Sequence, residues 1–354
     1  MNRDIGLELQ AVVKEAIVKR QPLAIRGGGS KSFLQSAPVA DKLEIRGHVG
    51  VIAYEPSELF ITARAGTPLA AIEAMLKHHN QMLGCEPPHY DDGGGMATLG
   101  GAVACGFSGS RRPFAGAMRD HVLGVQVLGG EGELMQFGGQ VMKNVAGFDV
   151  SRLMVGARGT LGALLEITLK VLPRPEAEET LVFECPLREA PERMSKLSRR
   201  ALPLSGLAWV EGHIFLRLEG TDAAIRSAQT QIGGELAAQG SDFWETLREQ
   251  THPFFRRHLP LWRLSLPPAA ALAPLQNDLV MDWAGGLRWW HTDQPAAEVE
   301  ALAHEYGGFA YLFRNMQAVL GNAPPAGLLA VHQRLKQAFD PHGIFNPGVM
   351  RVSG

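Results

Sequence analysis

A glycine triplet near the start of the chain is the first group of residues whose types and spacing suggest chemistry. The apolar segment Leu23-Ala24-Ile25 has the character of a short strand and leads directly into Arg26-Gly27-Gly28-Gly29-Ser30-Lys31. Consecutive glycines allow neighbouring backbone N–H groups to converge on one point, which is how a protein holds a diphosphate without side chains. Taken alone, the triplet is equally consistent with an ordinary tight turn.

The pattern around these glycines argues against two common nucleotide-binding motifs. It lacks the GxxxxGK[ST] sequence of a nucleoside-triphosphate P-loop. It also lacks GxGxxG at the start of a helix, the fingerprint of a Rossmann dinucleotide site. A diphosphate bound here would therefore be held by a different kind of loop.

Two further segments combine glycines with a threonine. Ala97-Thr98-Leu99-Gly100-Gly101-Ala102 places a hydroxyl before two adjacent glycines and a run of small residues, which permits close approach of a ligand. Gly156-Ala157-Arg158-Gly159-Thr160-Leu161-Gly162 repeats this composition at the entrance to a strand. Three such segments together favour a ligand-binding surface over three unrelated turns.

Helices and strands must position these segments. An amphipathic helix is predicted by the spacing of Leu9, Val12, Val13, Ala16 and Ile17, and it should end at Gln21-Pro22. Thr67 is expected to cap a helix that runs to about residue 79, Thr221 to cap another, and a final helix is expected over residues 328–339. Strands are predicted at 49–54, 59–65, 122–128, 133–137 and 163–171, the last with its odd-numbered residues on one face.

The chain divides into two parts of different composition. Glycine is dense in the first half, whereas all six tryptophans lie between Trp209 and Trp290. Prolines end regular structure and stiffen linkers, so Leu172-Pro173-Arg174-Pro175 is predicted to be a domain boundary. We expect an α+β fold with two domains.

Composition excludes several classes of function. A formal net charge of -2 over 354 residues gives no electrostatic reason to bind nucleic acid or an anionic membrane. No run approaches the ~18 apolar residues of a membrane span, and the first residues do not resemble a signal peptide. Cys85, Cys105 and Cys185 are too far apart to assemble an iron–sulfur or zinc site. We expect a cytoplasmic protein without direct membrane insertion.

Six segments in order carry a resemblance to a known family. They resemble the FAD-binding domain of the vanillyl-alcohol-oxidase (PCMH-type) family, and within it the D-2-hydroxyacid dehydrogenase branch that contains the FAD-binding subunits of bacterial glycolate oxidases. The segments are residues 26–30, 97–104, 119–128, 143–153, 159–173 and 340–348, and shorter similarities lie at 86–89, 108–113, 138–147, 261–265 and 282–290.

The resemblance implies a fold, a cofactor and a set of binding residues. It implies a two-subdomain FAD-binding domain over 1–173, a smaller α+β second domain over 174–327, and a segment over 328–354 that returns to the first domain. The first glycine loop would wrap the FAD pyrophosphate, the second would contact pyrophosphate and ribityl chain, the third the adenine half, and the C-terminal segment the flavin. The residues implied are Arg26, Gly27, Gly28, Gly29, Ser30 and Lys31; Thr98, Gly100 and Gly101; Gly159, Thr160 and Gly162; and Asn346.

Two departures from the family pattern are informative. Members with covalent flavin often carry histidine where this chain has Ser30, so we expect non-covalent FAD, with His89 as the remaining candidate for attachment. Catalytic members of the branch carry a HxGDGNxH-type motif in the second domain. The nearest segment here, Glu211-Gly212-His213-Ile214-Phe215, lacks its second histidine, acid and asparagine, so neither a metal site nor an autonomous catalytic base is expected.

Five residues are candidates for catalysis or substrate binding, each with an ordinary structural alternative. By resemblance Lys143 lies near the isoalloxazine, where it would stabilise an anionic reduced flavin; a solvated lysine is equally consistent. His213 and His291 titrate in the range of a general base, although most histidines are simply hydrogen-bonded. Arg263 and Arg288 could bind a substrate carboxylate through a forked contact, although structural ion pairs are commoner.

The resemblance also implies a function and partners. The chain would be the FAD-binding subunit of a glycolate oxidase complex, acting on glycolate or D-lactate with a larger FAD-containing subunit and an iron–sulfur subunit. Membrane association would come only through those subunits. The alternatives are a stand-alone FAD-dependent D-2-hydroxyacid dehydrogenase and a structural subunit that binds FAD without turnover. Trp283, Trp289 and Trp290 suit a core and an interface equally; because a complex is implied, we expect an exposed interface.

Overall fold

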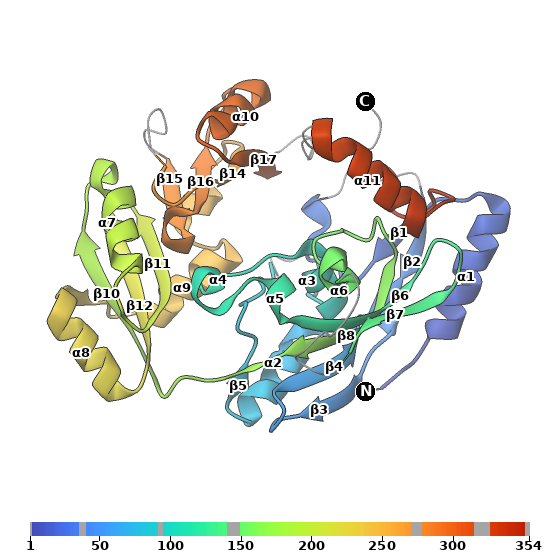
Figure 1. The fold of residues 1–354 in the computed structure, drawn as a ribbon, viewed down its shortest axis with the longest axis horizontal. Helices are drawn as coiled ribbons and strands as arrows, with labels where there is room; N and C mark the ends of the chain where they lie inside the picture. The colour runs from blue at the N-terminus through green and yellow to red at the C-terminus, as the bar shows by residue number, and fades with distance from the viewer. Residues whose placement is uncertain are drawn as a thin grey trace. The chain divides into compact units, whose positions relative to one another are not determined.

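The computed structural model describes residues 2–34, 40–90, 95–139, 149–270, 278–314 and 326–350. The chain forms two compact units, and each contains helices and predominantly antiparallel strands (Figure 1), as the predicted α+β class requires. One of the points at which the chain passes from the first unit to the second falls in the proline-flanked segment, at Pro173–Arg174. The first unit comprises Met1–Phe107, Gly116–Pro173 and Ala323–Gly354, and the second comprises Ser108–Ala115 and Arg174–Asn322.

A five-stranded antiparallel sheet forms the centre of the first unit. Its strand order is β3-β4-β8-β6-β7. The odd-numbered residues of the central strand are buried, as the alternation predicts, but Leu164 and Thr168 on its other face are buried too, so both faces of this strand are covered. The strands are β3 (Val51–Glu55), β4 (Phe60–Arg64), β6 (Val122–Leu128), β7 (Leu134–Gly138) and β8 (Ala163–Lys170).

A two-stranded parallel sheet, β1 (Leu23–Arg26) and β2 (Asp41–Glu44), carries the first glycine loop at its end. The helix α1 (Gly6–Lys19) precedes it and buries Leu9, Val13 and Ala16, one face of a 3.6-residue period. Val12, which the sequence analysis assigned to that face, is 41% exposed. Arg20 adopts a left-handed conformation and ends the helix just before Pro22.

The remaining elements of the first unit are short. The predicted N-cap Thr67 is wrong: Pro68 is extended, so α2 begins at Leu69, and the Thr67 hydroxyl instead accepts a hydrogen bond from Gly50 N at 3.0 Å. None of the described helices combines the length and apolar character that crossing a bilayer requires. These elements are η1 (Ser32–Leu34), η2 (Ile45–Gly47), α2 (Leu69–His78), β5 (Gln81–Met82), α3 (Leu99–Cys105), α5 (Met118–His121), α6 (Val150–Met154), β9 (Leu172–Pro173) and α11 (Ala326–Phe339).

The second unit is built on an eight-stranded sheet with the order β13-β10-β12-β11-β15-β16-β14-β17. Its core joins this sheet to α7, α8 and α10, and α8 begins, as predicted, with Thr221 accepting from Ala224 N. The strands are β10 (Ala177–Glu184), β11 (Leu204–Val210), β12 (His213–Gly220), β13 (Glu235–Leu236), β14 (Leu261–Ser265), β15 (Leu279–Asp282), β16 (Leu287–His291) and β17 (Phe309–Arg314). The helices are α4 (Arg112–Ala115), η3 (Leu187–Glu189), α7 (Ala190–Ser198), α8 (Asp222–Ile232), α9 (Gly240–Glu249), η4 (Pro253–Arg256), η5 (Trp283–Gly285) and α10 (Ala296–Glu305).

The prediction of an exposed tryptophan-rich surface in this unit is wrong. Trp283, Trp289 and Trp290 are only 7%, 7% and 4% exposed. Trp290 belongs to the core that joins the eight-stranded sheet to α7, α8 and α10. The Trp289 ring packs edge-on against the rings of Phe255 and Phe313. Large aromatic side chains bury more apolar area in a core than almost any other residue, and here the core takes them.

The C-terminal segment is bound tightly to the first unit. The Asp340 carboxylate accepts from the backbone N–H groups of Ile344 and Phe345 at 3.0 and 2.9 Å and from Lys336 Nζ at 2.5 Å. Lys336 also donates to the carbonyl oxygens of Thr160 and Phe345. Leu23 N then donates to Ile344 O at 2.7 Å, so the segment extends the edge of β1.

Replacing Asp340 by asparagine should therefore destabilise the first unit. The Asp340 side chain is fully buried, and loss of its charge weakens three hydrogen bonds at once, so we expect the free energy of unfolding to fall by about 1–3 kcal/mol. Urea titration followed by circular dichroism measures the change. Glu15→Gln removes the carboxylate of an exposed pair with Lys19 at the same i,i+4 spacing and should change nothing measurable. Equal effects of the two variants would contradict the role of Asp340.

Candidate functional site

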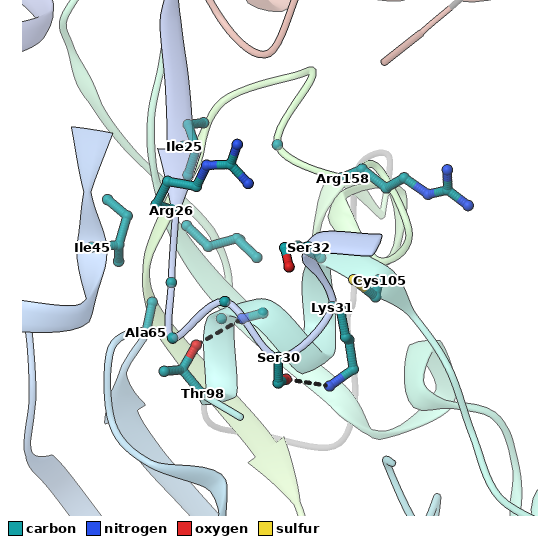
Figure 2. A pocket seen from close by; sticks show the side chains of 18 of the residues that line it. Ile25, Arg26, Ser30, Lys31, Ser32, Ile45, Ala65, Thr98, Cys105 and Arg158 are labelled. Carbon is teal, nitrogen blue, oxygen red and sulfur yellow. Dashed lines mark hydrogen bonds between the residues drawn. The ribbon is translucent and has the colours of Figure 1, made fainter. Parts of the chain in front are cut away.

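A cavity in the first unit brings the three glycine-rich segments together. Together with the open solvent at its mouth, the empty space is about 840 Å³. Figure 2 shows the loop after β1 crossing above Thr98, with Cys105 and Arg158 on the opposite side. The lining residues are Ile25–Ser32, Leu34, Ile45, Ala65, Met96, Thr98, Gly100, Gly101, Ala104, Cys105, Arg158, Gly159, Gly162, Leu164 and Asn346.

The first loop lies directly on the backbone of the second segment. Met96 N donates to Gly28 O at 3.1 Å, and Gly29 forms an isolated parallel bridge with Met96. A Cβ atom on Gly28 would overlap the Met96 carbonyl, and one on Gly95 would overlap the Gly28 carbonyl. Gly29 has φ of +85°, a conformation that side chains disfavour. Glycine is required at these positions because two backbones touch there.

The same loop offers unused hydrogen-bond donors to the cavity. The N–H groups of Gly27, Gly28 and Gly29 donate to no other residue among those the structure describes. Buried backbone N–H groups are nearly always paired, so three neighbouring donors at a cavity wall indicate an acceptor that is not part of the protein. Phosphate oxygens are the acceptors that such a concave set of donors suits.

The second segment contributes space rather than donors. The N–H groups of Leu99, Gly100 and Gly101 already donate to Thr67 O, Ala65 O and Thr98 Oγ1, which occupies the start of α3. A Cβ atom on Gly100 would come within 2.7 Å of Ala65 Cβ, so this glycine is needed for packing. Gly101 lines the cavity, and a Cβ atom on it would have Thr98 Oγ1, at 3.2 Å, as its one neighbour within 4 Å outside its own helix.

The ionisable groups of the lining suit an anion. The lining contains Arg26, Lys31 and Arg158 and, among the described residues, no carboxylate. Lys31 Nζ lies 3.3 Å from Ser30 Oγ, donates to His89 O at 3.2 Å and lies 5.4 Å from the centre of the Tyr90 ring. Positive charge around backbone donors is the electrostatic setting that a diphosphate requires.

Asn346 holds two walls of the cavity together. Its Oδ1 accepts from Ile25 N at 2.7 Å and its Nδ2 donates to Arg158 O at 2.6 Å, so it joins β1 to the third glycine segment. The contact of Asn346 with the flavin remains a prediction, whereas its two hydrogen bonds within the protein are observed. Thr160 differs from the prediction: it is 2% exposed, its hydroxyl donates to Ala157 O, and it is not part of the lining.

Among the lining residues that the sequence analysis missed, two carry ionisable groups. Arg158 adopts φ of +51° and places a cation at the wall, although the segment was noted only for its glycines and threonine. Cys105 was expected to be an ordinary buried thiol, yet it lines the cavity. Burial raises the pKa of this thiol, against the opposing charges of Lys31 and Arg158, so it is a neutral group of the wall.

The catalytic candidates have different surroundings. Lys143 lies outside the described residues. His213 sits at the start of β12, next to the turn of a hairpin, with Nδ1 3.0 Å from Glu211 O. Buried His291 faces carbonyl oxygens on both ring nitrogens, those of Leu259 and Phe254, as a structural histidine does.

Arg288 differs sharply from the expected substrate ligand. It is fully buried and donates to the carbonyl oxygens of Ala270 at 2.6 Å and Gly285 at 3.4 Å. Burial lowers the pKa of its guanidinium to about 10. A group so enclosed has no access to a substrate, and we assign it to the packing of the second unit. Arg263 is half-buried and retains the possibility of a ligand contact.

Comparison with known proteins identifies the class. Residues 7–138 match the family model of an FAD binding domain, and residues 296–350 match that of the FAD linked oxidases, C-terminal domain. Two solved structures of alkyldihydroxyacetonephosphate synthase share the fold, with TM-scores of 0.66 and 0.67 at 16% and 14% identity, over 96% of this chain and 74% and 75% of theirs. The fold and the cavity therefore define an FAD-binding protein, and the PCMH-type fold predicted from the sequence is confirmed.

The relatives narrow this class to a family. The chain is 45% identical to the glycolate oxidase subunit GlcE of Escherichia coli, over 98% of this chain and 97% of the relative. It is 25% identical to a D-lactate dehydrogenase of Archaeoglobus fulgidus over 63% of this chain and 54% of that protein. A glycolate oxidase subunit GlcD of Bacillus subtilis is 39% identical over 25% of this chain and 18% of its own. The chain belongs to the FAD-linked oxidase family that includes GlcE, and its cofactor is FAD.

Replacing Gly101 by alanine should weaken FAD binding without unfolding the protein. The added methyl would enter the cavity, while alanine is the better helix former, so we expect at least a roughly tenfold loss of FAD affinity at unchanged thermal stability of the apoprotein. Titration of apoprotein with FAD, followed by flavin fluorescence, measures the affinity.

Gly327→Ala is the matched control, since Gly327 is also helical and its Cβ would meet no atom within 4 Å. FAD affinity of Gly101→Ala equal to that of Gly327→Ala would show that the cofactor does not occupy this wall.

Proposed function

We propose that the chain is the FAD-binding subunit of a glycolate oxidase complex and takes part in the oxidation of glycolate to glyoxylate. The observation that carries the proposal is the 45% identity to a glycolate oxidase subunit over nearly the full length of both chains. The unpaired donors and cationic lining of the cavity support it, because they suit the FAD diphosphate. Bound FAD supplies a two-electron acceptor for the α C–H bond of a 2-hydroxy acid.

The chain's own residues would bind and orient the cofactor. Gly27, Gly28 and Gly29 would donate backbone N–H groups to the pyrophosphate, with Arg26 and Arg158 balancing its charge. The lining contains no histidine among the described residues, and Ser30 lacks a nitrogen that could bond to the flavin ring. His89, the other candidate for attachment, lies 2.9 Å from the Glu73 carboxylate and does not line the cavity. This arrangement supports non-covalent binding.

The same lining supports dependence on a partner for turnover. Oxidation of an alcohol requires a group that accepts the hydroxyl proton. Among the described lining residues the ionisable groups are Arg26, Lys31, Arg158 and Cys105, and the pKa of the Cys105 thiol is raised by its burial. Arginine stays protonated in proteins and the thiol stays neutral, so neither serves as a base near pH 7. Lys31 Nζ acts as a hydrogen-bond donor to Ser30 Oγ and His89 O. A larger FAD-containing subunit would supply the substrate base.

An iron–sulfur subunit would take the electrons onward. Cys85 and Cys185 are buried, and none of the described cysteines belongs to a group of three or more potential metal ligands. The relatives named as glycolate oxidase subunits support assembly into a complex. A D-lactate dehydrogenase among the relatives makes D-lactate the second substrate to test.

FAD should be released intact when the purified protein is denatured. With no covalent link from Ser30 or His89, acid precipitation or heating should leave the flavin in the supernatant and the polypeptide colourless. Absorbance of the separated fractions, with mass spectrometry of the polypeptide, measures this. A mass increment of one FAD on the denatured chain would contradict non-covalent binding.

The chain purified alone should turn over glycolate poorly or not at all, and the complete complex should turn it over readily. Reduction of a dye acceptor by glycolate and by D-lactate, measured for the FAD-loaded chain and for the co-purified complex, tests the proposal. Robust activity of the chain alone would establish a stand-alone dehydrogenase. A complex that keeps full activity with Gly101→Ala and no flavin in this chain would establish a structural subunit.

A further inference from the structure

Arg263, in the middle of β14, is surrounded by aromatic rings. It lies opposite Trp289 on β16 and Tyr311 on β17 in the strand register, and the carbon of its guanidinium is 5.8 and 5.5 Å from those ring centres. The Trp283 ring is nearer still, at 4.9 Å. Three rings around one guanidinium restrict its motion and remove much of its water, while their faces favour its charge.

Among the described residues this guanidinium has almost no polar partner. Its one hydrogen bond among the described residues is a long one, from Nη1 to Ser265 Oγ at 3.4 Å, and it forms no ion pair with them. A guanidinium has five N–H donors. Two other arginines of the unit have carboxylate partners: Arg111 pairs with Glu219 and Arg257 pairs with Asp278. Arg263 therefore keeps most of its donors for a partner outside the described protein.

The Trp283 ring, which lies nearest to Arg263, is held by a strained segment of backbone. Trp283 and Ala284 both adopt left-handed conformations, with φ of +53° and +56°, which non-glycine residues seldom do. Trp283 N donates to Asp282 Oδ1 at 2.6 Å, and Trp283 Nε1 donates to Gly109 O at 2.9 Å. Strain maintained by specific bonds is a mark of functional sites, and here it fixes the Trp283 ring beside Arg263.

We propose that Arg263 is a carboxylate-binding residue, and that Trp283, Trp289 and Tyr311 hold its guanidinium for a forked contact with a small organic acid. A carboxylate presents two oxygens in one plane, matching two parallel N–H groups of arginine. The ring faces exclude water from the contact and so strengthen it. Arg263 touches the ligand and has no part in proton transfer.

The choice of ligand rests on the proposed function, since glycolate and D-lactate each carry one carboxylate. Oxalate is the suitable probe, because it presents the same group and has no C–H bond to oxidise. Two of the surrounding rings are tryptophans, so an occupied site should change the intrinsic fluorescence of the chain.

The experiment titrates the FAD-loaded full chain with sodium oxalate at constant ionic strength and follows tryptophan fluorescence, with chloride as the reference anion. We expect a saturable change that chloride does not cause. Arg263→Gln should weaken oxalate binding roughly 10- to 100-fold, as expected for loss of charge-assisted hydrogen bonds. Arg263→Lys keeps the charge without the fork and should fall between the two. Arg257→Gln, at an arginine that also lies over a ring but has a carboxylate partner, should bind oxalate as the wild type does.

The outcomes separate this site from the proposed function. Absence of saturable binding, or equal binding by Arg263→Gln, overturns the site. If Arg263→Gln does not fold, as shown by near-UV circular dichroism, Arg263→Lys decides in its place: wild-type oxalate affinity overturns the site, and weakened affinity supports it. Oxalate binding that depends on Arg263 in a complex inactive towards glycolate would support the site and refute the proposed function.

Discussion

Contact between two backbones, with no room for a Cβ atom, is the constraint on which the cofactor site depends. Gly28 lies against the Met96 carbonyl and Gly95 against the Gly28 carbonyl, so the first glycine loop is held on the second segment by main chain alone. The N–H groups of Gly27, Gly28 and Gly29, which line the cavity, have no partner among the described residues. Because main-chain packing cannot relax as side chains do, the spacing of those donors is set by the fold itself.

The surrounding elements each fix one side of that contact. β1 leads directly into the first glycine loop, and Asn346 joins β1 to the segment that contains Arg158 and Gly159. Asp340 and Lys336 in turn hold Phe345, the residue directly before Asn346, and Lys336 also donates to Thr160 O. Residues far apart in sequence thus act together through hydrogen bonds to the backbone, which are insensitive to the side chains around them.

Many features with a local chemical reason could be predicted from the sequence, although the cap expected at Thr67 does not form because its hydroxyl bonds to Gly50 instead. The glycine loops, the face of α1 and the cap at Thr221 follow from conformational freedom, periodicity and capping within a few residues. Features decided by distant contacts could not. Trp289 and Trp290 were expected at an interface, yet both are buried. The sequence does not show which elements cover each face of a sheet. Arg263 and Arg288 look alike in the sequence, yet Arg288 is fully buried and Arg263 is partly exposed.

The order of the chain gives the C-terminal segment a further consequence. Asn346 follows the whole second unit in sequence, although it completes a wall of the first. Domains generally fold in order as they leave the ribosome. The first unit, however, cannot complete its cofactor site until almost the entire chain has been made. The nascent first half has its sheet and its glycine loops without the residue that joins β1 to Arg158. Cofactor capture is therefore a late event in biosynthesis, and a prematurely terminated chain would lack the finished site.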